Sequence, residues 1–148
     1  MTGEVVVKCV TSVYLSTDSE EDLSREDSEL VHFEKTSSDD PGISLLKHEH
    51  KWYVGSKSGC SCTFRHLFSV ELGFGGPVDW YEEEDDEINA TLSFVAIVRR
   101  MIREGNQLDC IDVWYNAELK DVVEKEVNLG NMADEEFRFF ESHLFRFF

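Results

Sequence analysis

The stretch Glu87–Glu104, EINATLSFVAIVRRMIRE, decides the fold of this 148-residue chain because it carries the clearest helical pattern in the sequence. Apolar residues recur in it every three or four positions, as one face of an α-helix requires. They are Ile88, Leu92, Val95, Val98 and Ile102, with Phe94, Ile97 and Met101 widening the stripe. Acidic residues precede the stretch, arginines gather toward its end, and Gly105-Asn106 follows as a stop signal. We therefore predict one long helix over residues 87–104.

The segments on either side of this helix have the composition of β-strands. Residues 4–15 are rich in β-branched side chains and apolar on both faces, which indicates a central strand. Residues 43–54 and 62–70 carry apolar side chains at even spacing, and the glycine-flanked residues 55–59 between them predict a hairpin turn. Residues 108–115 alternate in the same way and predict a further strand.

The C-terminal part of the chain is crowded with phenylalanines. They are Phe137, Phe139, Phe140, Phe145, Phe147 and Phe148. Aromatic side chains at this density suit a strand or hairpin packed on the core. Residues 118–129 leave two interpretations open, since their valines favour a strand and their charges favour a helix. We expect one α+β domain over residues 1–148, with a mixed or antiparallel sheet packed on the helix at about 87–104 and a C-terminal aromatic-rich strand or hairpin.

Residues 16–42 differ sharply in composition from the rest of the chain. They contain ten acidic residues against Arg25 and Lys35, a net charge of −8, together with six serines and Pro41-Gly42. A polar, charged segment of this kind lacks the apolar surface that a core requires. It predicts an acidic surface excursion at about 16–42, with a short helix near residues 20–31.

The charge of the whole chain excludes several classes of partner. There are 31 acidic residues against 14 Lys and Arg, a formal net charge of −17. Nucleic acids and anionic membranes are bound through clusters of Lys and Arg, and the sequence has no such cluster. We expect neither partner. No apolar run reaches the ~20 residues that cross a bilayer, and Met1–Glu4 lack the basic start of a secretory signal, so we expect a cytoplasmic protein.

One segment contains four residues that are able to bind a metal. His48 and His50 form one pair and Cys60 and Cys62 another, each with both side chains on one face of an extended strand. Zinc favours four such ligands in a tetrahedral arrangement. However, a single residue separates the cysteines, fewer than in common zinc sites and in dithiol redox motifs. The alternative is that the two thiols pack in the core, as we also expect for Cys110 in its apolar run.

These observations lead to three functional hypotheses. The leading one is a non-enzymatic binding or interaction protein, without a cofactor, that uses its acidic surface toward a basic protein partner. An antitoxin, an inhibitor or a nucleic-acid mimic would fit that description. The alternative is a metal- or thiol-dependent activity at the Cys60/Cys62 segment, with zinc as the cofactor. The third is a structural domain whose charge serves solubility only. No pair of acids stands out as a general acid and base. The leading hypothesis rests on the charge of the chain alone.

Overall fold

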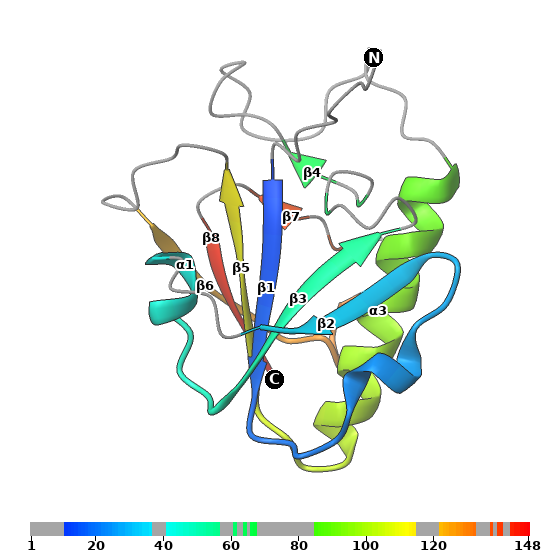
Figure 1. Ribbon diagram of the computed structural model, residues 1–148. Coiled ribbons are helices and arrows are strands. Elements are labelled where there is room, and N and C mark those ends of the chain that lie inside the picture. The colour runs from blue at the N-terminus through cyan, green and yellow to red at the C-terminus, as the bar shows by residue number, and fades with distance from the viewer. Residues whose placement is uncertain are drawn as a thin grey trace, which may run out of the picture.

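A six-stranded mixed sheet forms the centre of the structure (Figure 1). The computed structural model describes residues 11–36, 41–56, 61, 64, 66–67, 85–114, 122–132, 137, 139–140 and 143–148. In the order in which they pair, the strands are β2 (Val31–Lys35), β3 (His50–Ser56), β1 (Thr11–Thr17), β5 (Leu108–Trp114), β8 (His143–Phe147) and β6 (Val123–Val127). Neighbouring strands are antiparallel except β6 and β8, which are parallel. This arrangement confirms the predicted α+β fold with a mixed sheet.

Helix α3 covers one face of this sheet (Figure 1) and spans Asp85–Arg103, which confirms the helix predicted at 87–104. Its end has the hydrogen bonds of a Schellman motif. The Gly105 N–H donates to the carbonyl of Ile102 and the Asn106 N–H to that of Met101, both at 3.0 Å. Gly105 has a φ of +93°, which a residue with a side chain rarely adopts. The sequence signal Gly-Asn therefore ends the helix for the expected physical reason.

The main core lies between α3 and the sheet and is rich in phenylalanine. The ring of Phe94 on α3 lies 5.2 Å from that of Phe139, and the Phe137 ring lies 5.1 Å from Phe139 and 5.3 Å from Phe145. Each fully buried ring contributes roughly 1.5–3 kcal/mol by leaving water. Phe139 belongs to β7 (Phe139–Phe140), which pairs in parallel with β4 (His66–Leu67) in a second, two-stranded sheet. The predicted C-terminal aromatic strands are thus confirmed.

Strand β1 lies inside the sheet, between β3 and β5, as the composition of residues 4–15 predicts; residues 4–10 lie outside the described residues. The predicted hairpin between residues 43–54 and 62–70 is wrong. One edge of β3 pairs with β1 and the other with β2, so β3 has no edge left for β4. The segment 118–129, which the sequence left open, contains strand β6.

The opposite face of the sheet carries a smaller cluster of apolar side chains and a buried carboxylate. Leu46, which follows the short helix α1 (Pro41–Ser44), packs there with Ile111 and Leu144. Beside them Asp109 of β5 is 1% exposed. Its carboxylate accepts a hydrogen bond from the backbone N–H of Lys47 at 3.0 Å and one from the Ser16 hydroxyl. These bonds tie the chain after α1 to the centre of the sheet.

Candidate functional site

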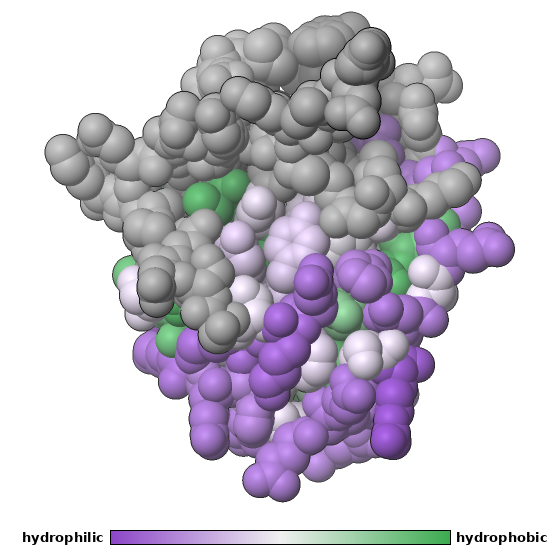
Figure 2. Space-filling view, viewed as in Figure 1, coloured by the Kyte–Doolittle hydropathy of each residue, from purple (hydrophilic) through white to green (hydrophobic). Residues whose placement is uncertain are grey.

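Residues 18–35, which we call the acidic corner, concentrate negative charge on the described surface. They hold eight acidic residues against Arg25 and Lys35, a net charge of −6. Six of the acids are exposed, namely Asp18, Glu20, Asp22, Asp27, Glu29 and Glu34. Hydrophilic side chains dominate the lower part of the view in Figure 2, where the connection from β1 toward β2 runs. The segment predicted as a surface excursion therefore contributes an ordered surface, and it also supplies β2, one of the two edge strands of the six-stranded sheet.

Short polar side chains fold the acidic corner by bonding to its own backbone. Asp22 precedes the 3₁₀ helix η1 (Leu23–Glu26) and accepts hydrogen bonds from the Ser24 N–H at 3.1 Å and the Ser24 hydroxyl at 2.6 Å. Farther along, the Asp27 carboxylate accepts from the Phe33 N–H at 2.7 Å and contacts His32 Nδ1 at 2.8 Å. Asp and Ser favour such turns because their side chains replace missing backbone partners. The serine-rich composition of this segment thus has a structural use.

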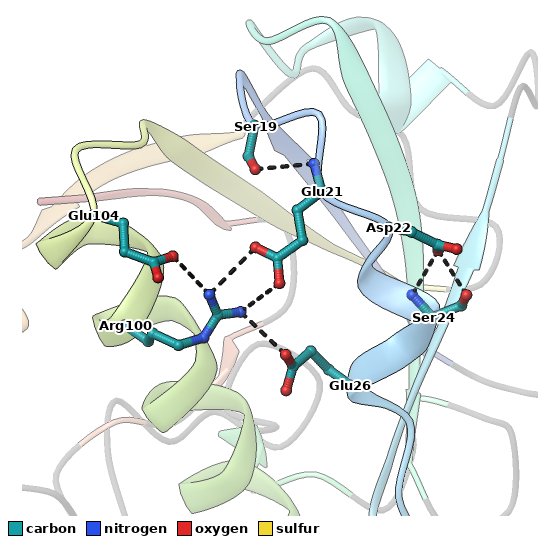
Figure 3. Close-up of polar contacts among 7 residues, drawn as sticks. All are labelled: Ser19, Glu21, Asp22, Ser24, Glu26, Arg100 and Glu104. Carbon is teal, nitrogen blue, oxygen red and sulfur yellow. Dashed lines mark hydrogen bonds and ion pairs between the residues drawn. The ribbon is translucent and has the colours of Figure 1, made fainter.

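Arg100 of α3 fixes the acidic corner to the body of the protein (Figure 3). Its guanidinium donates to both carboxylate oxygens of Glu21, at 2.8 and 3.3 Å, and to Glu26 at 3.3 Å. It also reaches Glu104, four residues later and directly after the end of α3, at 2.7 Å. The hydrogen bond to Glu21 is the main cause that raises the pKa of Arg100 above its ordinary value. Through Glu21 and Glu26, Arg100 thus connects η1 and the residue pair before it to α3.

A cavity of about 440 Å³ lies at the acidic corner, with wall residues from both η1 and β2. Acidic residues of the wall include Glu20, Glu21 and Asp22. Glu34 also contributes to the wall, but it alternates with Phe33 and Lys35 along β2, so its side chain points to the other face of the strand. The buried side chains of Phe33 and Trp52 add aromatic surface, and Lys35 is the only lysine among the described residues of the wall. Hydrogen bonds from Ser24, more than the charges of Arg25 and Lys35, hold the pKa of Asp22 below its ordinary value. Asp22 is therefore ionised at neutral pH.

Within this cavity Lys35 lies against Trp52. The Lys35 Nζ is 5.2 Å from the centre of the indole ring, a distance at which the ring attracts a cation. The same nitrogen lies 3.3 Å from Nδ1 of His50. Lys35 and Trp52 are direct partners in the pairing of β2 with β3. The protein's own ammonium group thus occupies an aromatic, acid-lined position.

The structure places the predicted metal ligands only in part. The His48 N–H donates to the Ser16 hydroxyl at 3.1 Å and the His48 carbonyl accepts from the Lys51 ammonium group, while His50 begins β3 and contacts Lys35. Cys60 and Cys62 lie outside the described residues. Among the residues that are described, no three His, Cys, Asp or Glu side chains gather as a metal site would require. The four-ligand zinc site stays a prediction, which elemental analysis of the purified protein would decide.

Ser61, which lies between Cys60 and Cys62 in the sequence, and Cys110 both have structural roles. Ser61 is fully buried; its hydroxyl accepts from the Val13 N–H at 2.9 Å and donates to the Val54 carbonyl at 2.6 Å, which links β1 to β3. Cys110 is a free, fully buried thiol, as its apolar surroundings predict. Burial, followed by the charges of Asp109 and Asp112, raises the pKa of Cys110 well above its usual range. Cys110 therefore stays protonated and is a poor nucleophile.

A second cavity, of about 430 Å³, lies between the end of α3 and residues 128–132. Arg99, Arg103 and the exposed ring of Phe148 line it. Arg99 donates to the carbonyl of Leu129 at 3.1 Å and to that of Met132 at 2.5 Å. Because its guanidinium is engaged by backbone carbonyls, Arg99 connects α3 to the following loop. This cavity is accordingly a weaker candidate than the one at the acidic corner.

No protein-family model matches the chain, and comparisons with curated proteins and solved structures found no significant similarity. In the part of the chain that is described, no helix is long and apolar enough to span a membrane. Sequence reasoning missed the cavity residues Lys35 and Trp52. The local signal in the sequence was a lysine in a mostly acidic segment. The contact of Lys35 with Trp52 could not be predicted from it, because that contact is set by the pairing of β2 with β3.

Proposed function

We propose that this chain is a non-enzymatic interaction protein whose acidic corner binds a basic surface of a protein partner. The observation that supports this proposal is the ordered backbone beneath the acids. A charged tail that served only solubility would need no fixed geometry. Here Arg100, Asp22 and Asp27 hold the acidic corner in one conformation through the contacts described above.

Fixed carboxylates favour association in two ways. An ordered surface loses less conformational entropy on binding than a flexible one, so more of the interaction energy remains as affinity. A concentrated negative field also attracts a basic partner and raises the association rate, in a manner that salt weakens. Both effects depend on the position of the charges as well as on their number.

A matched pair of double variants tests this proposal. Glu20→Gln with Glu34→Gln removes two charges from the acidic corner, whereas Glu49→Gln with Glu126→Gln removes two exposed charges elsewhere. Basic proteins retained by the immobilised wild-type chain are identified by mass spectrometry, and one is purified for calorimetric titration. We expect the first pair to weaken its binding about tenfold and the second pair to leave it nearly unchanged.

Two outcomes would contradict the proposal. Equal effects of both pairs would mean that net charge alone, and not the acidic corner, governs binding. Binding that persists unchanged at ~1 M salt would exclude steering by surface charge, because charges on the surface are screened within about 3 Å under that condition.

A further inference from the structure

The contact between Lys35 and Trp52 shows which chemical group the cavity of the acidic corner accommodates. The Lys35 side chain is exposed and lies on an edge strand, yet its ammonium group remains over the indole ring. Trp52 itself is only 3% exposed. A long, solvated lysine can leave such a position without disturbing the backbone. Its departure would open a cation-binding ring face inside an acid-lined cavity.

The rest of the cavity wall presents more polar groups than the ammonium group of a single lysine can bind. Glu21 is already paired with Arg100, but Glu20 and Asp22 also line the cavity, and Lys35 is the only lysine among the described residues of its wall. The Nε1 of Trp52 is shielded from solvent and has no acceptor among the described residues. A buried donor without an acceptor is costly and is uncommon in folded proteins. A guest with several donors would satisfy the carboxylates of the wall better than Lys35 does.

We propose that this cavity receives an arginine side chain of the basic partner, which displaces Lys35 from the face of Trp52. The inference rests on the proposed function, because it specifies how the acidic corner recognises its partner. Guanidinium is planar, stacks on an indole and presents five donors to surrounding carboxylates, whereas ammonium acts as a point charge.

An NMR titration with a blocked tripeptide, acetyl-Gly-Arg-Gly-amide, tests this exchange. The corresponding citrulline peptide has nearly the same shape without the charge and serves as the ligand control. Lys35→Gln removes the resident cation, and Lys47→Gln removes an exposed cation elsewhere, so both variants change the net charge equally. We expect Lys35→Gln to bind the arginine peptide about two- to fivefold more tightly than Lys47→Gln does.

The indole N–H resonance of Trp52 supplies a readout that general charge attraction would not move. It is assigned by its loss in Trp52→Phe, whose folding is checked by the dispersion of its other resonances. We expect this resonance to shift with the arginine peptide and to remain in place with the citrulline peptide. The Trp52→Phe variant should bind the arginine peptide less tightly, because phenylalanine attracts a cation more weakly than tryptophan.

Failure of this inference can be distinguished from failure of the proposed function. Equal affinities of Lys35→Gln and Lys47→Gln, or an unmoved Trp52 resonance at saturation, would overturn the arginine site. The proposed function would survive that result if the Glu20 and Glu34 variant still weakened partner binding. If neither double variant affected partner binding, the proposed function would fall together with the inference that rests on it.

Discussion

The acidic corner and strand β5 both contain carboxylates, and the two sets lie in opposite environments. In the corner, six of eight acidic side chains are exposed and hydrated, and Arg100 pairs with the two that are half-buried. In β5, Asp109 and Asp112 are 1% and 0% exposed. A buried carboxylate is tolerated when fixed donors replace water, as Ser16 and the Lys47 N–H do for Asp109.

This contrast separates carboxylates that hold the fold from carboxylates that are available to a partner. Loss of a buried acid leaves its donors buried without an acceptor, so the cost falls on stability. Loss of an exposed acid exchanges one hydrated group for another, so any cost falls on binding. Net charge counts both kinds equally and cannot tell them apart.

The largest effect that we expect comes from Asp109→Ala. It removes the acceptor of Ser16 and Lys47 and leaves Arg146, whose guanidinium lies 3.9 Å from the carboxylate, without this partner. We expect a loss of about 3–5 kcal/mol in the free energy of unfolding, measured by urea denaturation. Glu49→Ala, at an exposed position, should stay within about 0.5 kcal/mol of wild type. Similar losses in both variants would remove the distinction between the two regions.

Arg100→Gln should have an intermediate effect. It leaves Glu21, Glu26 and Glu104 close together without their shared cation. These side chains are partly exposed, so solvent screening limits the loss to about 1–2 kcal/mol. Hydrogen exchange should accelerate selectively in residues 18–30, because the corner is no longer fixed to α3. Arg103→Gln, on the same helix and with the same charge change, is the control, and equal acceleration there would refute the locking role of Arg100.

Neutralising exposed acids should affect stability least. The double variant Glu20→Gln with Glu34→Gln should unfold within about 0.5 kcal/mol of wild type in urea. A small gain is also consistent, since like charges in a chain of net charge −17 repel one another. A loss of more than ~2 kcal/mol would mean that these acids hold the fold, and the partner-binding experiment would then require other variants.

The smallest effect concerns the pH dependence of stability at Asp22. Its pKa is lowered in the folded state by hydrogen bonds from Ser24, so its stabilising contribution is present above the unfolded value near 3.8 and is lost as the pH falls through the lower folded value. Asp22→Asn removes this titration while keeping an acceptor for Ser24. We expect a slightly shallower fall of urea stability below pH 4 in the variant. An unchanged or steeper fall would contradict the assignment.

The parts of the fold that the sequence predicts are those with local signals. The helix at 87–104 follows from its apolar spacing and its Gly-Asn stop, and the C-terminal strands follow from the density of phenylalanine. The prediction of a hairpin after β3 was wrong because the acidic segment forms β2. Strand β2 pairs with the edge of β3 that the hairpin would have needed. No local pattern reveals which strand will occupy an edge.

The candidate site was predicted in charge but not in geometry. The composition of residues 16–42 indicates an acidic surface, yet the position of Lys35 over Trp52 depends on the register between β2 and β3. Burial of Asp109 had a visible signal in its apolar neighbours Leu108, Cys110 and Ile111. Because Asp109 and Asp112 are three residues apart, they point to opposite faces of β5, and burial of both requires cover on each face.

The interior position of β1 has a consequence for how the chain folds during synthesis. This early strand pairs Thr11 with Trp114, so one of its two neighbours leaves the ribosome about a hundred residues later. Contacts between such distant segments make folding slow and leave partly made chains prone to aggregation. A nascent chain that stalls after β5 would expose the edge that β8 normally pairs with, along with the helix face that Phe145 and Phe147 cover. The pairing of β1 with β5 therefore makes formation of the central sheet wait for synthesis of the chain through residue 114.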